Sequence, residues 1–287
     1  MATSEEAQRI NQRIKSAARN TGIPVTRLRS RIAFQRVLAR LALDHAWVLK
    51  GGFSLEMRLG LVARSTKDLD LWRLSAPIGS ALDLQDTLDE ALSRDLLDGF
   101  TFHVGLPRQM RIQDAEPTTW RIPIRAFYSG SLFTEATIDV VTTDNASSHE
   151  TELLHIEPAV VGEAFSISAL GLDRHAAEKY HACVRVYAND RPSTRVKDLV
   201  DLVLLIEGEW LRPAKLGAAV RRVFRERNNI DPPGSLPDRP PADWERTYAS
   251  LARETGATVA DVEEAWALAS RTYILALEQE GEERVLR

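Results

Sequence analysis

The sequence has little of what marks disulfide-bonded, zinc-stabilised or membrane-spanning proteins. It contains one cysteine, Cys183, which excludes an internal disulfide and a zinc ribbon. No run approaches the roughly 18 uncharged apolar residues that a membrane span needs. Residues 1–15 lack the apolar segment of a secretory signal. From these absences we expect a soluble, cytoplasmic protein with no membrane partner.

Two common catalytic motifs are also missing. A Gly-x-Ser-x-Gly turn is absent, so we expect no serine hydrolase, and no His-Glu-x-x-His spacing is available for zinc. By contrast, 44% of the 287 residues are apolar, which is enough to bury a substantial core. The length fits one large domain or two modest ones.

Acidic residues are absent from residues 7–40, and this segment is strongly basic. Residues 1–40 carry a charge of +7 and the remaining residues −11, for a net charge of −4. Such asymmetry is typical of chains that meet a polyanion or an acidic partner. A solvated helix face that pairs with the body's own carboxylates is the other interpretation. The nine basic residues are Arg9, Arg13, Lys15, Arg19, Arg27, Arg29, Arg31, Arg36 and Arg40.

Hydrophobic periodicity predicts an α+β chain. The predicted strands lie at residues 46–49, 68–72, 100–105, 120–127 and 135–142. The predicted helices lie at residues 5–20, 25–44, 53–60 and 80–97, and the chain from Asp173 onward is mostly helical, with a proline-rich loop near residues 230–242.

The most informative stretch is KGGFSLEMRLGLVARSTKDLDLW, residues 50–72. Asp68 and Asp70 are two apart in a predicted strand, which places both carboxylates on one face. The two charges would repel unless a cation lies between them, and Mg²⁺, or Mn²⁺ in its place, prefers such oxygen ligands. Asp139, on the predicted strand 135–142, is the candidate third metal ligand.

A glycine turn precedes the carboxylate pair by about 15 residues. Gly51 and Gly52 let the backbone approach a ligand, and Ser54 is predicted to open a helix whose first amides favour phosphate. Either element alone is common, as a solvated edge strand or an ordinary turn. A phosphate cradle followed by a carboxylate pair is the apparatus of nucleotidyl transfer, and this combination favours the functional interpretation.

These segments resemble a known family. Lys50-Gly51-Gly52-Phe53-Ser54-Leu55, followed by Arg64-Ser65-Thr66-Lys67-Asp68-Leu69-Asp70-Leu71, resembles the first motif of the AbiEii/AbiGii-type (MenT-like) nucleotidyltransferase toxins. Glu178-Lys179-Tyr180-His181-Ala182 and Arg195-Val196-Lys197-Asp198-Leu199-Val200-Asp201-Leu202 resemble two further motifs of that family. The resemblance covers roughly residues 45–210.

This resemblance implies a DNA polymerase β-like nucleotidyltransferase core, a mixed sheet with helices, followed by a helical region. Together with the helices predicted at both ends of the chain, this gives a division into basic N-terminal helices at 1–44, the core at 45–170 and a helical C-terminal domain at 171–287. The resemblance also implies a toxin that uses Mg²⁺ to transfer nucleotides from NTP to the 3′ end of tRNA. That modification would block aminoacylation and translation, and a cognate antitoxin would neutralise the toxin.

Site roles also follow from the resemblance. Asp68 and Asp70 would hold the metals, the glycine turn and Ser54 the phosphates, and Lys179 the triphosphate, while Asp201 would complete the site. From the residues alone, Lys179 is expected at the margin of an apolar stripe with its ammonium emerging, as a partner for Asp201. An ordinary surface pair of Lys197 with Asp201 remains the alternative.

Two other functions stay open at this point. One is a small-molecule nucleotidyltransferase of the aminoglycoside-resistance type, and the other is a non-catalytic nucleic-acid or partner-binding protein on the same fold. A cationic aminoglycoside needs an acidic pocket, whereas tRNA needs a basic surface. The basic segment favours tRNA, with Arg27, Arg29 and Arg31 as candidate contacts.

Overall fold

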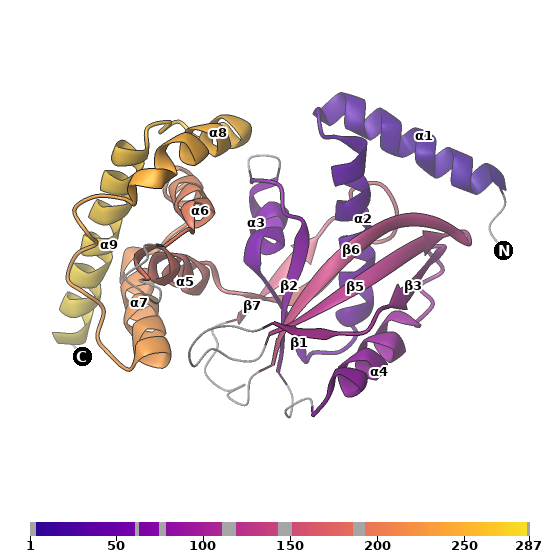
Figure 1. Ribbon diagram of the computed structural model, residues 1–287, viewed down its shortest axis with the longest axis horizontal. Helices are drawn as coiled ribbons and strands as arrows, with labels where there is room; N and C mark the ends of the chain where they lie inside the picture. Colours follow the sequence, from indigo (N-terminus) through magenta and orange to yellow (C-terminus); the bar gives the residue numbers. More distant parts are fainter. Residues whose placement is uncertain are drawn as a thin grey trace. The chain divides into compact units, whose positions relative to one another are not determined.

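The computed structural model describes residues 4–60, 63–74, 79–110, 119–142, 151–185 and 193–285 (Figure 1). Two compact units make up the chain. The first comprises Met1–Met57 and Ser65–Leu170, and the second comprises Arg58–Arg64 and Gly171–Arg287. The first unit holds a mixed sheet with helices and the second is helical, so the predicted α+β class is confirmed.

The first unit is built on one eight-stranded sheet of order β3-β5-β6-β2-β1-β8-β7, with β4 paired to β5. Its strands are β1 (Trp47–Lys50), β2 (Asp68–Arg73), β3 (Phe100–Val104), β4 (Arg108–Met110), β5 (Thr119–Tyr128), β6 (Ser131–Thr142), β7 (Thr151–Ile156) and β8 (Phe165–Leu170). β2 runs antiparallel to β1 and parallel to β6, so it lies inside the sheet. The sequence prediction did not include β4, β7 or β8.

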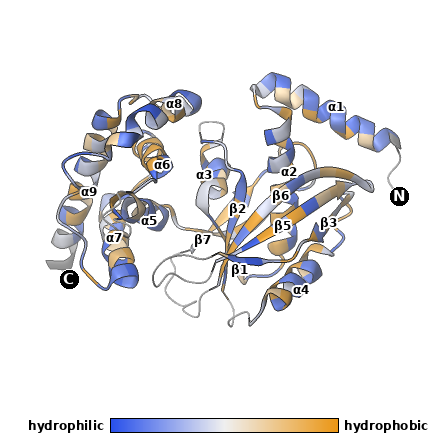
Figure 2. Cartoon of the chain, in the orientation of Figure 1, coloured by the Kyte–Doolittle hydropathy of each residue, from blue (hydrophilic) through white to orange (hydrophobic). Residues whose placement is uncertain are grey.

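Helices cover one face of this sheet. They are α2 (Val25–Leu41), which contacts β6 and β8, and α4 (Ala81–Leu92), which contacts β3. The other two helices in this part of the chain are α1 (Ser4–Thr21), which contacts α2, and α3 (Gly51–Leu59), which directly follows β1. The core joins side chains of α2 and α4 to the inward residues of the central strands. Figure 2 shows hydrophobic residues, in orange, along these helices and strands. The members of the core include Phe34, Val37, Leu38, Leu41, Leu69, Leu71, Leu84, Leu88, Ile122, Ile124, Ile138 and Val140.

The N-terminal helices belong to this same unit. The sequence suggests residues 1–44 as a separate region, but α2 supplies one wall of the sheet's core. α1 packs its stripe of Ile10, Ile14 and Ala18 into a second cluster that includes Phe100 and Phe133. Burial against the sheet, rather than helix propensity, therefore fixes where these helices lie.

The second unit consists of helices packed around a core of their own. They are α5 (Leu172–Val184), α6 (Val196–Glu207), α7 (Pro213–Asn228), the short 3₁₀ helix at Ala242–Trp244, α8 (Glu245–Thr255) and α9 (Val262–Val285). Cys183 is buried, and the Tyr180 hydroxyl donates to the Ala269 carbonyl at 3.0 Å. Within the described part of the chain, no helix combines the length and apolar character that crossing a bilayer requires.

Candidate active site

Asp68 and Asp70 lie on the face of β2 that points away from the helix-covered core. Leu69 and Leu71, which alternate with them, are fully buried in that core. In the parallel pairing of β2 with β6, Asp70 lies opposite Asp139. The alternation in β6 also follows the prediction, since Ile138 and Val140 are buried in the core on either side of Asp139. Two neighbouring strands thus bring the three predicted carboxylates to one face.

Gly51 is what allows Asp70 to occupy its position. It has a φ of +67°, and a Cβ built on it would lie 1.9 Å from Oδ2 of Asp70. α3 begins at this glycine, earlier than the predicted start at Phe53. Ser54 therefore sits inside the helix, fully buried, rather than opening it. The first amides of α3 remain outside the helix's own hydrogen bonds, which is the property that binds phosphate.

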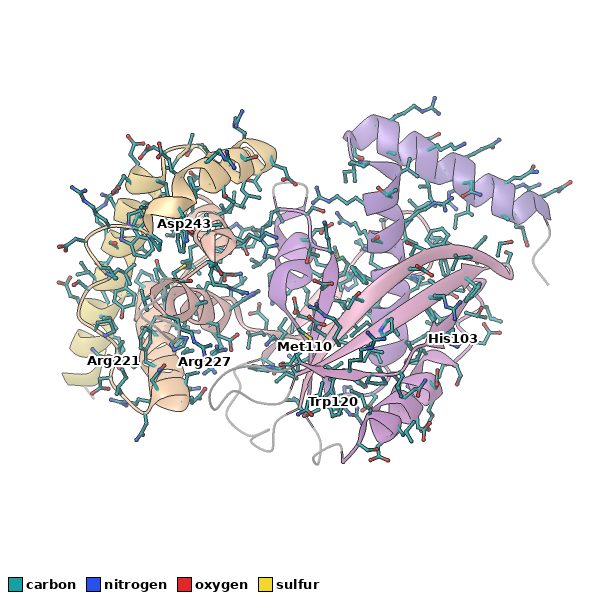
Figure 3. The ribbon with its side chains drawn as sticks, viewed as in Figure 1. His103, Met110, Trp120, Arg221, Arg227 and Asp243 are labelled. Atoms are coloured by element: carbon teal, nitrogen blue, oxygen red, sulfur yellow. The ribbon has the colours of Figure 1, made fainter. Side chains whose placement is uncertain are left out.

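The sequence analysis missed Arg121, which lies among the carboxylates. Arg121 faces Asp139 across β5 and β6, and its Nε and Nη2 donate to Oδ1 and Oδ2 of Asp139 at 2.9 and 2.6 Å. Its Nη2 is also 4.0 Å from Oδ2 of Asp68. The hydrogen bonds to Asp139, with the charges of Asp139, Asp68 and Asp70, raise the pKa of Arg121 above its usual value. Figure 3 shows the side chains and labels the neighbouring Trp120.

A divalent cation fits the oxygen donors on this face. In the described ranges, no three acidic, histidine or cysteine side chains form a preassembled metal cage. Mg²⁺ commonly takes only one or two carboxylates and completes its shell with water and substrate phosphates. Asp68 and Asp70 meet that need, whereas both oxygens of Asp139 are engaged by Arg121.

A second polar cluster lies within the helical unit. The Lys179 ammonium donates to Asp198 at 2.9 Å and to Asp201 at 2.7 Å. Nε of Arg64 donates to both oxygens of Asp201 at 3.0 and 3.1 Å, and Arg195 donates to Asp198 at 2.7 Å. The expected partnership of Lys179 with Asp201 is therefore present. Arg64 and Arg195 were part of the quoted motifs, but the sequence analysis assigned them no role in this cluster.

Two expectations for this cluster need correction. The Lys179 ammonium does not emerge from the helix, because the residue is only 5% exposed and holds two carboxylates. The alternative surface pair of Lys197 with Asp201 is also wrong, since Asp201 is buried against Lys179 and Arg64. Against the effect of burial, the two aspartates raise the pKa of Lys179, and the cations Lys179 and Arg195 lower the pKa of Asp198.

We expect Lys179→Met to reduce the free energy of unfolding by about 3–5 kcal/mol, because it leaves two buried carboxylates without their shared cation. Lys197→Met, on the exposed side of the neighbouring helix, is the control and should change it by less than about 0.5 kcal/mol. Urea denaturation measures both. The pKa of Asp198 is lower in the folded protein than in the unfolded chain. Its charge therefore contributes fully to the free energy of unfolding above pH ~4, and this contribution is lost as the pH falls toward the pKa of the folded state. Equal stabilities of the two variants would contradict a structural role for Lys179.

The basic N-terminal segment is partly engaged inside the protein. Arg31 and Arg27 lie 3.5 and 4.0 Å from the buried Glu56, and Arg29 donates to Asn11 and to the Phe133 carbonyl. Arg36 and Arg40 are buried beside Asp98, which forms two hydrogen bonds with Arg40. The exposed basic residues of the segment lie on α1, namely Arg9, Arg13, Lys15 and Arg19.

The comparison with protein families settles which family carries these features. The family model described as nucleotidyl transferase AbiEii toxin, Type IV TA system, matches residues 32–271. The chain belongs to the AbiEii family. The matched residues include the nucleotidyltransferase core and extend beyond the sheet into the helical unit.

Two further comparisons were made with this AbiEii-family chain. No curated protein matches it. Among solved structures, the antibiotic-resistance factor ANT(2'')-Ia is similar with a TM-score of 0.37 and 16% sequence identity, over 69% of this chain and 92% of that chain.

Proposed function

We propose that this AbiEii-family protein transfers nucleotides from NTP to the 3′ end of tRNA in a Mg²⁺-dependent reaction, and so blocks aminoacylation and translation. The observation that carries the proposal is the placement of Asp68 and Asp70 on the open face of β2, with Asp70 seated against Gly51 at the start of α3. This arrangement sets metal ligands beside a helix N-terminus that favours phosphate.

In the proposed reaction the protein mainly positions its substrates. Asp68 and Asp70 would hold the divalent cations, which would supply charge to orient the triphosphate and to favour the deprotonated acceptor hydroxyl. The amides of Gly51 and Gly52 at the start of α3 bind phosphate oxygens, and the absence of a Cβ at Gly51 keeps Asp70 in place. Contact of Ser54 and Lys179 with the triphosphate, and a role for Asp201, stay predictions.

The acceptor is tested by incubating the full chain with Mg²⁺, each labelled NTP and either total tRNA or an aminoglycoside. We expect label on tRNA only. A tRNA sample whose terminal cis-diol has been oxidised by periodate is the control, because it lacks the 3′ hydroxyl and should remain unlabelled. Label on the aminoglycoside would instead establish the small-molecule function, and no transfer to either acceptor would indicate a non-catalytic binding protein.

The α1 surface offers a test of tRNA binding. We expect Arg9→Gln, Lys15→Gln and Arg19→Gln together to weaken tRNA binding and to flatten its dependence on log salt, by roughly 0.7–0.9 for each phosphate that is no longer neutralised. NTP binding should not change, and affinity measured across a salt series checks both statements. Curves that superimpose on those of the unsubstituted protein would show that α1 does not contact tRNA.

The matched control removes the same number of positive charges, three, from α2. Arg27→Gln, Arg29→Gln and Arg31→Gln together test the contacts suggested by the sequence. These arginines also form ion pairs with Glu56 and hydrogen bonds with Asn11 and the Phe133 carbonyl. The melting temperature of this variant should therefore fall, whereas that of the α1 variant should not. If an antitoxin rather than tRNA binds the basic segment, both variants will lose antitoxin binding while tRNA affinity stays constant.

A further inference from the structure

A cationic side chain of the protein itself lies among the proposed metal ligands. The guanidinium of Arg121 forms two parallel hydrogen bonds with Asp139, at 2.9 and 2.6 Å, and approaches Asp68 to 4.0 Å. Such fork-to-fork pairing is the strongest geometry available between arginine and a carboxylate. It is set by the backbone, because Arg121 and Asp139 are directly opposed in the antiparallel pairing of β5 with β6.

This pairing is incompatible with metal binding at Asp139. Both carboxylate oxygens already accept a hydrogen bond, and a divalent cation bound there would meet the positive guanidinium at short range. Asp139 can therefore serve as a third ligand only after Arg121 has moved away. Asp68 lies farther from the guanidinium, at 4.0 Å, so the conflict centres on Asp139.

Exposure decides which partner can move. The Arg121 side chain is 44% exposed and Asp139 only 14%. Asp139 also lies between Ile138 and Val140, whose burial in the core fixes the strand around it. Once a metal ion competes for Asp139, the long and partly exposed Arg121 side chain can change rotamer, whereas the short carboxylate on a central strand cannot follow it.

We propose that Arg121 is a built-in counter-cation that competes with a divalent metal ion for Asp139. It neutralises the carboxylate face until the metal takes its place, and it thereby sets the affinity of the site for the metal. The inference rests on the proposed metal-dependent function and adds a positioning residue to it. Arg121 acts through Asp139 and has no assigned contact with substrate.

The test is a calorimetric titration of Mn²⁺ into the full chain without nucleotide. We expect Arg121→Gln to bind Mn²⁺ roughly tenfold more tightly, because a competing charge-assisted pair is removed. Arg125→Gln is the matched control, since Arg125 lies four residues along β5 on the same exposed face, opposite Glu135. The Mn²⁺ affinity of Arg125→Gln should stay within about threefold of that of the unsubstituted protein, because the solvent and salt screen a charge several residues away. When Arg121→Gln is combined with Asp139→Asn, the gain in Mn²⁺ affinity should disappear.

The thermal response provides a second readout. Mn²⁺ should raise the melting temperature of Arg121→Gln more than that of Arg125→Gln, because tighter binding to the folded state stabilises it more. Equal or weaker Mn²⁺ binding by Arg121→Gln than by Arg125→Gln would overturn the competition. Asp70→Asn separates the two claims. If it leaves Mn²⁺ binding unchanged, the proposed metal site itself is wrong, and if it abolishes binding while Arg121→Gln has no effect, only the present inference fails.

Discussion

Asp68→Asn and Asp70→Asn are each expected to lower nucleotide transfer by at least about 10³-fold, since metal ligation contributes several kcal/mol to such reactions. Both side chains lie on the open face of β2, and neither contributes to the core of Leu69 and Leu71. Replacing one charge by an isosteric amide also relieves carboxylate repulsion on that face. The melting temperature should therefore hold or rise while activity disappears.

The measurement is single-turnover transfer of labelled nucleotide, together with thermal unfolding of the same samples. Asp86→Asn, on the exposed side of α4, is the control for loss of an acidic residue and should keep full activity. Transfer near the rate of the unsubstituted protein by either active-site variant would remove that residue from the site. Unfolding of both variants would show that the carboxylates are structural.

Gly51→Ala is expected to reduce transfer by about 10²-fold or more, although glycine makes no side-chain contact of its own. The added Cβ would lie 1.9 Å from Oδ2 of Asp70, so the carboxylate must move, and displacements of about 1 Å in a reacting assembly cost this much. The left-handed φ of +67° adds backbone strain of about 1–2 kcal/mol for alanine.

A second glycine separates these two effects. Gly130→Ala, in the hairpin between β5 and β6, introduces alanine at a φ of +77° with no atom near the new Cβ. It should lose similar stability and retain activity. If Gly51→Ala is as active as Gly130→Ala, the seating of Asp70 against Gly51 has no part in catalysis.

The sequence predicted those parts of the site that depend on local pattern. The alternation around Asp68, Asp70 and Asp139 correctly assigned each carboxylate to the face opposite the buried Leu and Ile residues. A strand's period of two is a local property, so it can be read without knowing the partner strand. The glycine turn is likewise visible locally, because Gly51 and Gly52 closely follow a short apolar run.

The rest depended on pairing between distant segments. Arg121 is identified only when β5 is aligned with β6, because register across a hairpin decides which side chain faces Asp139. The sequence analysis predicted a strand over residues 120–127 but did not single out Arg121, because alternation with Ile122 and Ile124 gives a face of the strand and no partner. Burial of Lys179 likewise depends on Asp198 and Asp201, 19 and 22 residues away. Helix periodicity alone placed the Lys179 ammonium at the margin of the apolar stripe, because periodicity carries no information on which other helix packs against that side chain.

The interleaved order of the two units has a consequence for synthesis of the chain. Arg64 belongs to the helical unit, but its partner Asp201 follows 137 residues later in the sequence. At about 5–20 residues per second, the ribosome therefore adds Asp201 roughly 7–27 s after Arg64. β8 lies between β1 and β7, so until Phe165–Leu170 has emerged, β1 is the open edge of the nascent sheet. A transcript truncated before that point would therefore yield a polypeptide in which β1, the neighbour of β2, has an unpaired edge, and such a polypeptide would be prone to aggregate.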